Sequence, residues 1–296
     1  MGRVYLTDIY NVIHSEFVPL FNPFQSYFDH LPSWDGVSDP IGDLADTVHV
    51  KSDQAEFRDY FRKWFVGILP ALLDDTVVNH EILVLIGEQG LYKTTWFNFL
   101  LPPELRCYFY TKTNSDRLNK DDLFSLTEFA LICFEELDGM RPAELNQLKA
   151  MVTMPYVNER AAYGRNKERH PHIASFCGTG NNVQFLTDPT GNRRWLPFEV
   201  SQIRDPHLHA IPYELVYSQA YALWKSGFCH WFSQEEIRKL NMHNSRFEVP
   251  NLEEDLIRTH FRKPFEGEAG IFVTAADILE QISSCLRYPL SPNKIG

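Results

Sequence analysis

The sequence predicts an α/β fold with a three-layer core and flanking helical segments. Two observations lead to this prediction. The apolar runs 82–86, 129–134 and 173–177 are typical of strands buried on both faces, and amphipathic helical patterns lie between and around them. We therefore expect a core over residues 77–230, an N-terminal helical segment over 1–76 and a C-terminal helical segment over 231–296.

Composition places the chain among soluble globular proteins. Of its 296 residues 44% are hydrophobic and 14% aromatic, enough to bury one large core. No apolar run reaches the roughly 18 residues that a membrane helix needs, and the N-terminus lacks the pattern of a secretion signal. We expect a cytoplasmic protein without a membrane partner.

Cysteine spacing and net charge indicate which kinds of protein this chain does not resemble. The five cysteines are far apart and form no C-x-x-C pair, so they are expected to be small reduced core residues. The net charge of −11 argues against a protein coated by nucleic acid but leaves room for a local basic element.

Two patterns describe the N-terminal segment. Residues 1–50 carry scattered aromatic residues among prolines, which predicts short helices joined by turns. Residues 54–73 place aromatic and aliphatic side chains at spacings of three and four, which predicts an amphipathic helix packed under the core. An aromatic cofactor box is the less favoured interpretation of that helix.

The organising motif follows the run 82–86, where the sequence reads GEQGLYKTT. Gly87, Lys93 and Thr94 fit the first glycine, the lysine and the hydroxyl residue of the phosphate-binding P-loop, G-x-x-x-x-G-K-[ST]. An apolar stripe that stops before Pro102 predicts a helix beginning near Lys93. A strand, a glycine loop and a helix N-terminus suit a triphosphate.

The motif is incomplete because Tyr92 stands where the second glycine is required. Either Gly90 supplies the backbone freedom or the loop has an altered shape. Lys93 would reach the β- and γ-phosphates of ATP, and Thr94 would offer its hydroxyl to Mg²⁺. The residues expected to bind the nucleotide are Gly87, Gly90, Lys93, Thr94 and Thr95. The alternative is an ordinary strand-to-helix turn with a solvated lysine.

An acidic pair, Glu135 and Glu136, ends the run 129–134 about 40 residues after the loop, as a Walker B element does. One carboxylate would hold Mg²⁺ together with Thr94, for which Glu135 is the predicted ligand, and the other would orient or deprotonate the attacking water. Which glutamate has which role is open, and Asp138 is a reserve candidate. The alternative is a solvated acidic turn.

A basic segment over 158–172 carries four Lys/Arg and two His in 15 residues. We expect a protruding hairpin or loop whose basic side chains contact a nucleic-acid backbone, with Arg160, Arg165, Lys167 and Arg169 as the contacts. The alternative is a solvated loop that makes ion pairs between subunits.

Two further polar groups follow the run 173–177. Asn181 or Asn182 could orient the attacking water or sense the γ-phosphate, although Gly-Asn clusters are commonly plain turns. A turn then presents Arg193 and Arg194, either of which could neutralise charge on a transferring phosphoryl group, often from a neighbouring subunit. A structural arginine pair bound to carboxylates is the alternative.

The remaining chain predicts helices over 213–227, from Ser233 onward, over 252–261 and over 275–283. The last of these is similar to the first helix of a winged-helix domain, and the sequence stops before the rest of such a domain. We expect that the chain is a fragment of a longer protein.

Taken together, the motifs resemble the virulence-associated protein E family, P-loop ATPases of phages and mobile elements that are similar to superfamily 3 helicases. The resemblance covers most of residues 20–200, and its most specific part is Thr190-Gly191-Asn192-Arg193-Arg194. The other residues that carry it are Gly87-x-x-Gly90-x-x-Lys93-Thr94-Thr95, Glu135-Glu136-Leu137-Asp138, Arg160 with Tyr163-Gly164-Arg165, and Gly178-Thr179-x-Asn181.

This resemblance implies an AAA+-like core that assembles as a ring, a hexamer, with ATP at the subunit interfaces. It also implies that Asn181 matches the motif C asparagine, that Arg193 or Arg194 is the arginine finger, and that 158–172 is the hairpin facing DNA. Two departures stand out: Tyr92 replaces a glycine, and Gly180 replaces a more usual threonine.

The sequence thus predicts an ATP-hydrolysing motor, a replicative helicase or primase-helicase ATPase domain, that uses ATP and Mg²⁺ and acts on single-stranded DNA. A nucleotide-binding module that has lost hydrolysis is the alternative, for which Tyr92 is the chief argument. A small-molecule kinase is disfavoured because no second lid or substrate-phosphate cluster is visible in the sequence.

Overall fold

The computed structural model describes residues 4–13, 15, 17–19, 21–113, 120–159, 168–188, 191–250, 252–265 and 267–283. The chain forms two compact units, Met1–Phe247 and Glu248–Gly296. The second unit contributes two helices, α10 (Leu252–His260) and α11 (Ala275–Ser283). All the elements described below belong to the first unit.

A six-stranded sheet forms the centre of the first unit, in the order β1-β8-β2-β7-β4-β3. Five of its strands run parallel, and β1 pairs antiparallel with β8 at one edge. A separate antiparallel hairpin consists of β5 and β6. The strands are β1 (Val48–Val50), β2 (Ile82–Ile86), β3 (Phe109–Lys112), β4 (Leu131–Phe134), β5 (Tyr156–Glu159), β6 (Glu168–Pro171), β7 (Ser175–Gly180) and β8 (Trp195–Ile203).

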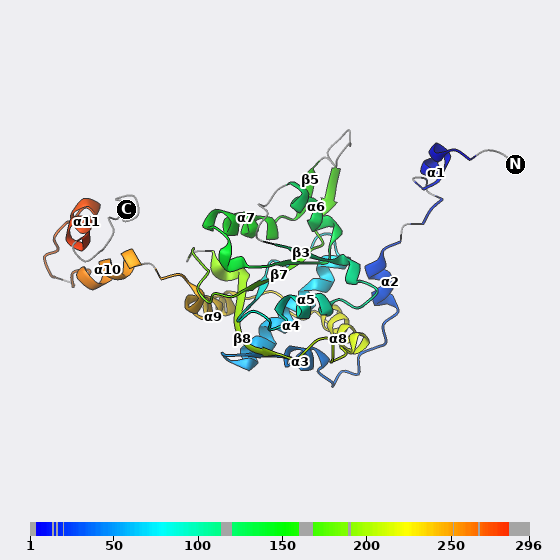
Figure 1. The fold of residues 1–296 in the computed structure, drawn as a ribbon, viewed down its shortest axis with the longest axis horizontal. Coiled ribbons are helices and arrows are strands. Elements are labelled where there is room, and N and C mark those ends of the chain that lie inside the picture. The colour runs from blue at the N-terminus through cyan, green and yellow to red at the C-terminus, as the bar shows by residue number, and fades with distance from the viewer. Residues whose placement is uncertain are drawn as a thin grey trace. The chain divides into compact units, whose positions relative to one another are not determined.

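Helices cover both faces of this sheet (Figure 1). They are α2 (Pro23–Asp29), α3 (Pro40–Ala45), α4 (Gln54–Leu73), α5 (Lys93–Leu100), α6 (Lys120–Glu128), α7 (Pro142–Val152), α8 (Tyr213–Lys225) and α9 (Gln234–Asn244). A further helix, α1 (Leu6–Ile13), buries none of its residues. None of the helices in the described part of the chain combines the length and apolar character that a bilayer-spanning segment requires.

The side chains of β2 show why the fold has three layers. All five residues of this strand are buried, and successive side chains point to opposite faces. Leu83 and Leu85 pack with α4, α5 and α8 on one face. Ile82, Val84 and Ile86 pack with α6 and α7 on the other. The predicted three-layer α/β core is therefore confirmed, and its sheet is mainly parallel.

The long helix α4 is predicted at its observed boundaries, 54–73. It begins at Asp53, whose side chain accepts the backbone N–H of Ala55. Its aromatic stripe is fully buried, and the indole of Trp64 donates a hydrogen bond of 2.9 Å to the carbonyl of Phe176 in β7. This contact ties the helix directly to the central sheet.

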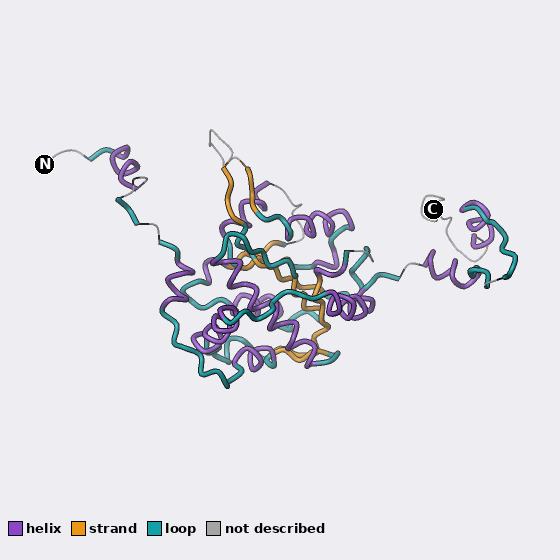
Figure 2. The backbone as a smooth tube through the Cα atoms, turned by 180° about the vertical axis from the view of Figure 1, so that it is seen from behind, coloured by secondary structure: helices purple, strands orange, loops and turns teal. Residues whose placement is uncertain are grey.

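Three observations differ from the sequence predictions or extend them. The segment 48–50, expected among short helices, adds β1 to the sheet edge. The strand expected over 173–177 instead runs from Ser175 to Gly180, so Gly178 and Gly180 are strand residues rather than a turn. The strands of the predicted basic hairpin extend side by side away from the sheet (Figure 2).

Candidate functional site

A cleft of about 460 Å³ opens where β2, β4 and β7 end. Because neighbouring parallel strands end at the same edge, the segments that follow them meet there. The cleft is lined by Gln89, Gly90, Leu91, Tyr92, Lys93, Thr94, Thr95, Glu135, Glu136, Thr179 and Asn181. The structure thus brings the predicted loop, acidic pair and asparagine to one place.

Lys93 is the first residue of α5 and is only 8% exposed. Its ammonium donates hydrogen bonds to the carbonyls of Gly87 (2.6 Å) and Glu88 (2.7 Å) and to Oδ1 of Asn181 (3.3 Å). Burial lowers the pKa of Lys93, and the negative charge of Asp138 opposes that shift. A partly desolvated cation at a helix N-terminus is suited to an anionic ligand.

Thr94 contacts the acidic pair directly. Its hydroxyl donates a hydrogen bond of 2.8 Å to Oε1 of Glu135, which follows β4. A hydroxyl and a carboxylate in contact offer the hard oxygen ligands that Mg²⁺ prefers. No group of three or more His, Cys, Asp or Glu side chains that could hold a metal by themselves occurs among the described residues. A magnesium ion at this point would therefore need further oxygens from water or from a phosphate.

Two non-glycine residues of the cleft have left-handed backbone. Tyr92 has φ 60° and ψ 17° immediately before α5, and Glu136 has φ 55° and ψ 45° after β4. Gly90, with φ +87°, is a second left-handed residue in the loop that contains Tyr92. Gly90 therefore does not replace the glycine that the motif requires at position 92. Tyr92 itself adopts the left-handed backbone, which is strained for a residue with a Cβ.

Gly87 is required by close packing. A Cβ at this position would lie 2.9 Å from the carbonyl oxygen of Val200 in the neighbouring strand β8. The loop therefore leaves β2 in contact with the adjacent backbone, an approach that only glycine allows.

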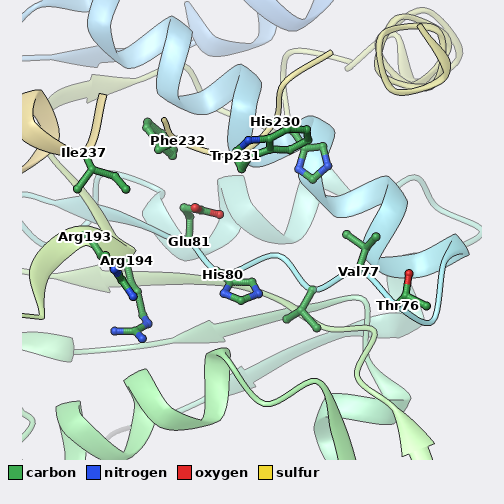
Figure 3. Close-up of a pocket in the computed structure, with 11 residues that line it drawn as sticks. Thr76, Val77, His80, Glu81, Arg193, Arg194, His230, Trp231, Phe232 and Ile237 are labelled. Carbon is green, nitrogen blue, oxygen red and sulfur yellow. The ribbon is translucent and has the colours of Figure 1, made fainter. Parts of the chain in front are cut away.

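The predicted arginines lie elsewhere. Arg193 and Arg194 precede β8, at the end of the sheet opposite the Lys93 cleft, and line a second pocket of about 410 Å³ (Figure 3). Within the described residues neither guanidinium forms an ion pair with a carboxylate, which disfavours a structural arginine pair. They stand beside the start of β2, whereas Lys93 follows the end of that strand.

The second pocket has an unusual electrostatic composition. In Figure 3 the side chains of His80 and Glu81 project between the arginines and the segment His230–Trp231. Burial raises the pKa of Glu81 to about 7. Burial lowers the pKa of Arg194, and the charge of Arg193 lowers it further. The pocket therefore holds one partly desolvated cation, Arg194, beside the exposed Arg193, and Glu81 compensates them only weakly.

Of the predicted nucleic-acid contacts, Arg169 is described and the other three, Arg160, Arg165 and Lys167, lie outside the described residues. Arg169 is exposed on β6, with its guanidinium 3.7 Å from the ring centroid of Tyr156 on β5. A cation stacked on an exposed aromatic ring is a combination found where bases and phosphates are bound.

Sequence reasoning missed two features of the site. Thr179 lines the cleft from β7. It was not predicted as a site residue, because the strand was expected to end at Cys177. The carboxylate of Asp138 accepts backbone N–H groups of Asn181 and Asn182. No sequence spacing indicates such a contact, because its partners come from the end of another strand. The cysteine prediction is confirmed for Cys133 and Cys177, which are buried free thiols, whereas Cys107 and Cys229 are exposed.

Comparisons with known proteins give the family and the fold. A family model described as the virulence-associated protein E-like domain matches residues 29–249. No curated protein matches the chain. Among solved structures, the apo C terminal region of NrS-1 is similar, with 12% identity and a TM-score of 0.50 over 78% of this chain and 56% of that one. A second apo form of that region gives 13% identity and a TM-score of 0.49, with 78% and 55% coverage.

At these identities the likeness concerns the fold alone, and this chain spans little more than half the length of the solved structures it resembles. The family match covers more of the chain, because it extends from the last residue of α2 to beyond α9 and includes the whole sheet and both pockets. The chain belongs to the virulence-associated protein E-like domain family.

Proposed function

We propose that this chain is an ATP-hydrolysing nucleic-acid motor, the ATPase domain of a replicative helicase or primase-helicase of a phage or mobile element. The observation that carries the proposal is the convergence of Lys93, the Thr94–Glu135 pair and Asn181 in one cleft. The sheet supports it, since β2, which leads into the loop, lies between the parallel strands β8 and β7, so the loop emerges at the carboxyl edge where ligands of α/β sheets bind.

In this proposal each side chain has a distinct task. Lys93 gives up its carbonyl contacts and neutralises the β- and γ-phosphates of ATP. Thr94 and Glu135 hold Mg²⁺, which supplies electrostatic stabilisation of the phosphates. Glu136, exposed at the cleft, orients or deprotonates the attacking water, and Asn181 senses the γ-phosphate.

The remaining parts act between molecules. Arg193 or Arg194 reaches the nucleotide of a neighbouring subunit, because both lie at the far end of the sheet from their own cleft. A ring, a hexamer in the family resemblance, supplies that neighbour. The hairpin of β5 and β6 carries Arg169 and Tyr156 toward single-stranded DNA.

The test is ATP hydrolysis with and without single-stranded DNA, for the wild-type chain and Lys93→Ala. We expect hydrolysis stimulated by DNA in the wild type and a loss of at least about 100-fold in the variant, because a phosphate-neutralising cation is removed. A phosphate release that is equal in the two proteins contradicts the proposal.

One observation favours a second candidate, a nucleotide-binding module without hydrolysis. Lys93 is held by the carbonyls of its own loop, and Tyr92 occupies a strained position beside it. A loop locked in this form would bind ATP without turning it over. Tight ATP binding by the wild type with no phosphate release would support this candidate, and transfer of phosphate to a metabolite would instead identify a kinase.

A further inference from the structure

The turn after β4 contacts the segment that follows β7 through one carboxylate. Oδ1 of Asp138 accepts the backbone N–H of Asn181 at 3.1 Å, and Oδ2 accepts the backbone N–H of Asn182 at 3.0 Å. The two strands are parallel neighbours, with Phe134 opposite Gly178. Asp138 therefore holds two successive amides at the point where β7 ends, with one oxygen for each.

Two glycines of β7 make room for this turn. The side chain of Leu137 lies over Gly178, where a Cβ would collide with it. At Gly180 a Cβ would lie 2.9 Å from Oδ1 of Asp138. A methyl group at position 180 would therefore crowd the carboxylate of Asp138, which would have to shift relative to the two amides.

The held segment carries the asparagine of the cleft. Oδ1 of Asn181 accepts a hydrogen bond of 3.3 Å from the ammonium of Lys93. A chain of contacts thus runs from Asp138 through the Asn181 backbone to its side chain and on to Lys93. Glu135, by contrast, points to Thr94. The two carboxylates have separate partners, and both oxygens of Asp138 are already engaged by the protein.

We propose that Asp138 is a positioning residue that fixes Asn181 against the reacting phosphate, an inference that rests on the proposed ATPase function. It acts through the backbone of Asn181 and does not hold the metal. Without it, the amide of Asn181 is no longer fixed relative to the phosphate, and misplacement of a catalytic group by about 1 Å is enough to cost roughly 10²-fold in rate.

The first test is a double-mutant cycle between Asp138→Asn and Asn181→Ala in the whole chain. Asparagine has one acceptor oxygen, so it can satisfy only one of the two amides. We expect Asp138→Asn to lower kcat about 10-fold with KM for ATP changed less than about 2-fold. We expect the double variant to be no slower than Asn181→Ala alone, because Asp138 acts only through Asn181. Multiplied effects in the double variant would overturn the proposal, as would a raised requirement for Mg²⁺ in Asp138→Asn.

A second variant reaches the same contact from the other side. Gly180→Ala leaves Asp138 in place but puts a methyl group against its Oδ1. We expect the same selective loss of kcat as in Asp138→Asn, with a circular dichroism spectrum like that of the wild type. Wild-type kcat in a folded Gly180→Ala protein would contradict the proposal.

A structural readout separates this inference from the proposed function. Amide hydrogen exchange at Asn181 and Asn182, measured by NMR without nucleotide, reports the contact whether or not the chain hydrolyses ATP. We expect at least one of these amides to exchange about 10-fold faster in Asp138→Asn, and unchanged protection overturns the positioning role by itself. Absence of phosphate release from the wild type, with the amides protected as expected, would overturn the proposed function instead.

Discussion

The backbone of Tyr92 combines a bulky side chain with a conformation that favours glycine. Its φ of 60° destabilises the folded chain by on the order of 1 kcal/mol relative to glycine. A glycine at this position would relieve that strain, but its greater conformational entropy in the unfolded chain would cancel part of the gain. Tyr92→Gly is therefore expected to raise the free energy of unfolding by about 0.5 kcal/mol, measured by urea denaturation. Its affinity for ATP should stay within about 3-fold of the wild type, because the side chain is exposed.

Glu88→Gly is the matched control for this prediction. Glu88 is an exposed residue of the same loop without positive φ, so glycine there relieves no strain. We expect it to lower the free energy of unfolding by about 0.5 kcal/mol. If Tyr92→Gly destabilises the chain as much as Glu88→Gly, the tyrosine ring contributes contacts that exceed its backbone strain.

At the scale of elements, the sequence predicts most of the sheet and its helices, and it fails where distant partners decide the structure. Helix α4 and strand β2 are readable because their periodicities extend over whole elements. Strand β7 is misjudged at its end because Gly178 and Gly180 favour turns locally, whereas pairing with both β2 and β4 keeps them extended. The contacts of Asp138 could not be predicted for the same reason, since its amide partners lie about 40 residues away in the sequence.

Helix α9 offers a prediction about pH at this scale. Burial tends to raise the pKa of Glu236, but hydrogen bonds from Lys63 and from the backbone and hydroxyl of Ser233 outweigh it, and the pKa falls to about 2. A depressed carboxyl pKa stabilises the fold above the unfolded value near 4.5, and this contribution is lost as the pH falls toward 2. Glu236→Gln keeps the capping oxygen but loses the charge, so it should lower the free energy of unfolding by about 1 kcal/mol at pH 7.

That difference should shrink as the pH falls below about 5, when urea denaturation is repeated along a pH series. Glu235→Gln removes the same charge from the same helical turn, but Glu235 pairs with Lys239 at 3.4 Å on the exposed surface. Its effect should be no more than about 0.3 kcal/mol. Equal losses in the two variants would show that the helix dipole, rather than Lys63, accounts for the effect.

At the scale of the whole molecule, the two pockets lie at opposite ends of the same strands. Ile82 of β2 is opposite Trp195 of β8, so the arginines stand beside the start of β2 and Lys93 follows its end. Five residues of strand separate these ends by roughly 15 Å. In the proposed ATPase, one subunit would not bring both groups to one phosphate, and a head-to-tail assembly would place the arginines of one subunit against the cleft of the next.

This geometry predicts complementation between two inactive variants. The Lys93→Ala protein keeps intact arginines, and the double variant Arg193→Ala/Arg194→Ala keeps an intact cleft. In a ring formed from an equal mixture of the two, about a quarter of the interfaces place intact arginines against an intact cleft. Phosphate release should reappear in the mixture after subunit exchange, although neither protein alone is active. A mixture of Lys93→Ala with Glu135→Gln is the control, because both changes damage the same cleft and a mixed ring leaves no interface with an intact one. Recovery of activity only in the first mixture requires arginines that act between subunits, and the absence of recovery there excludes them.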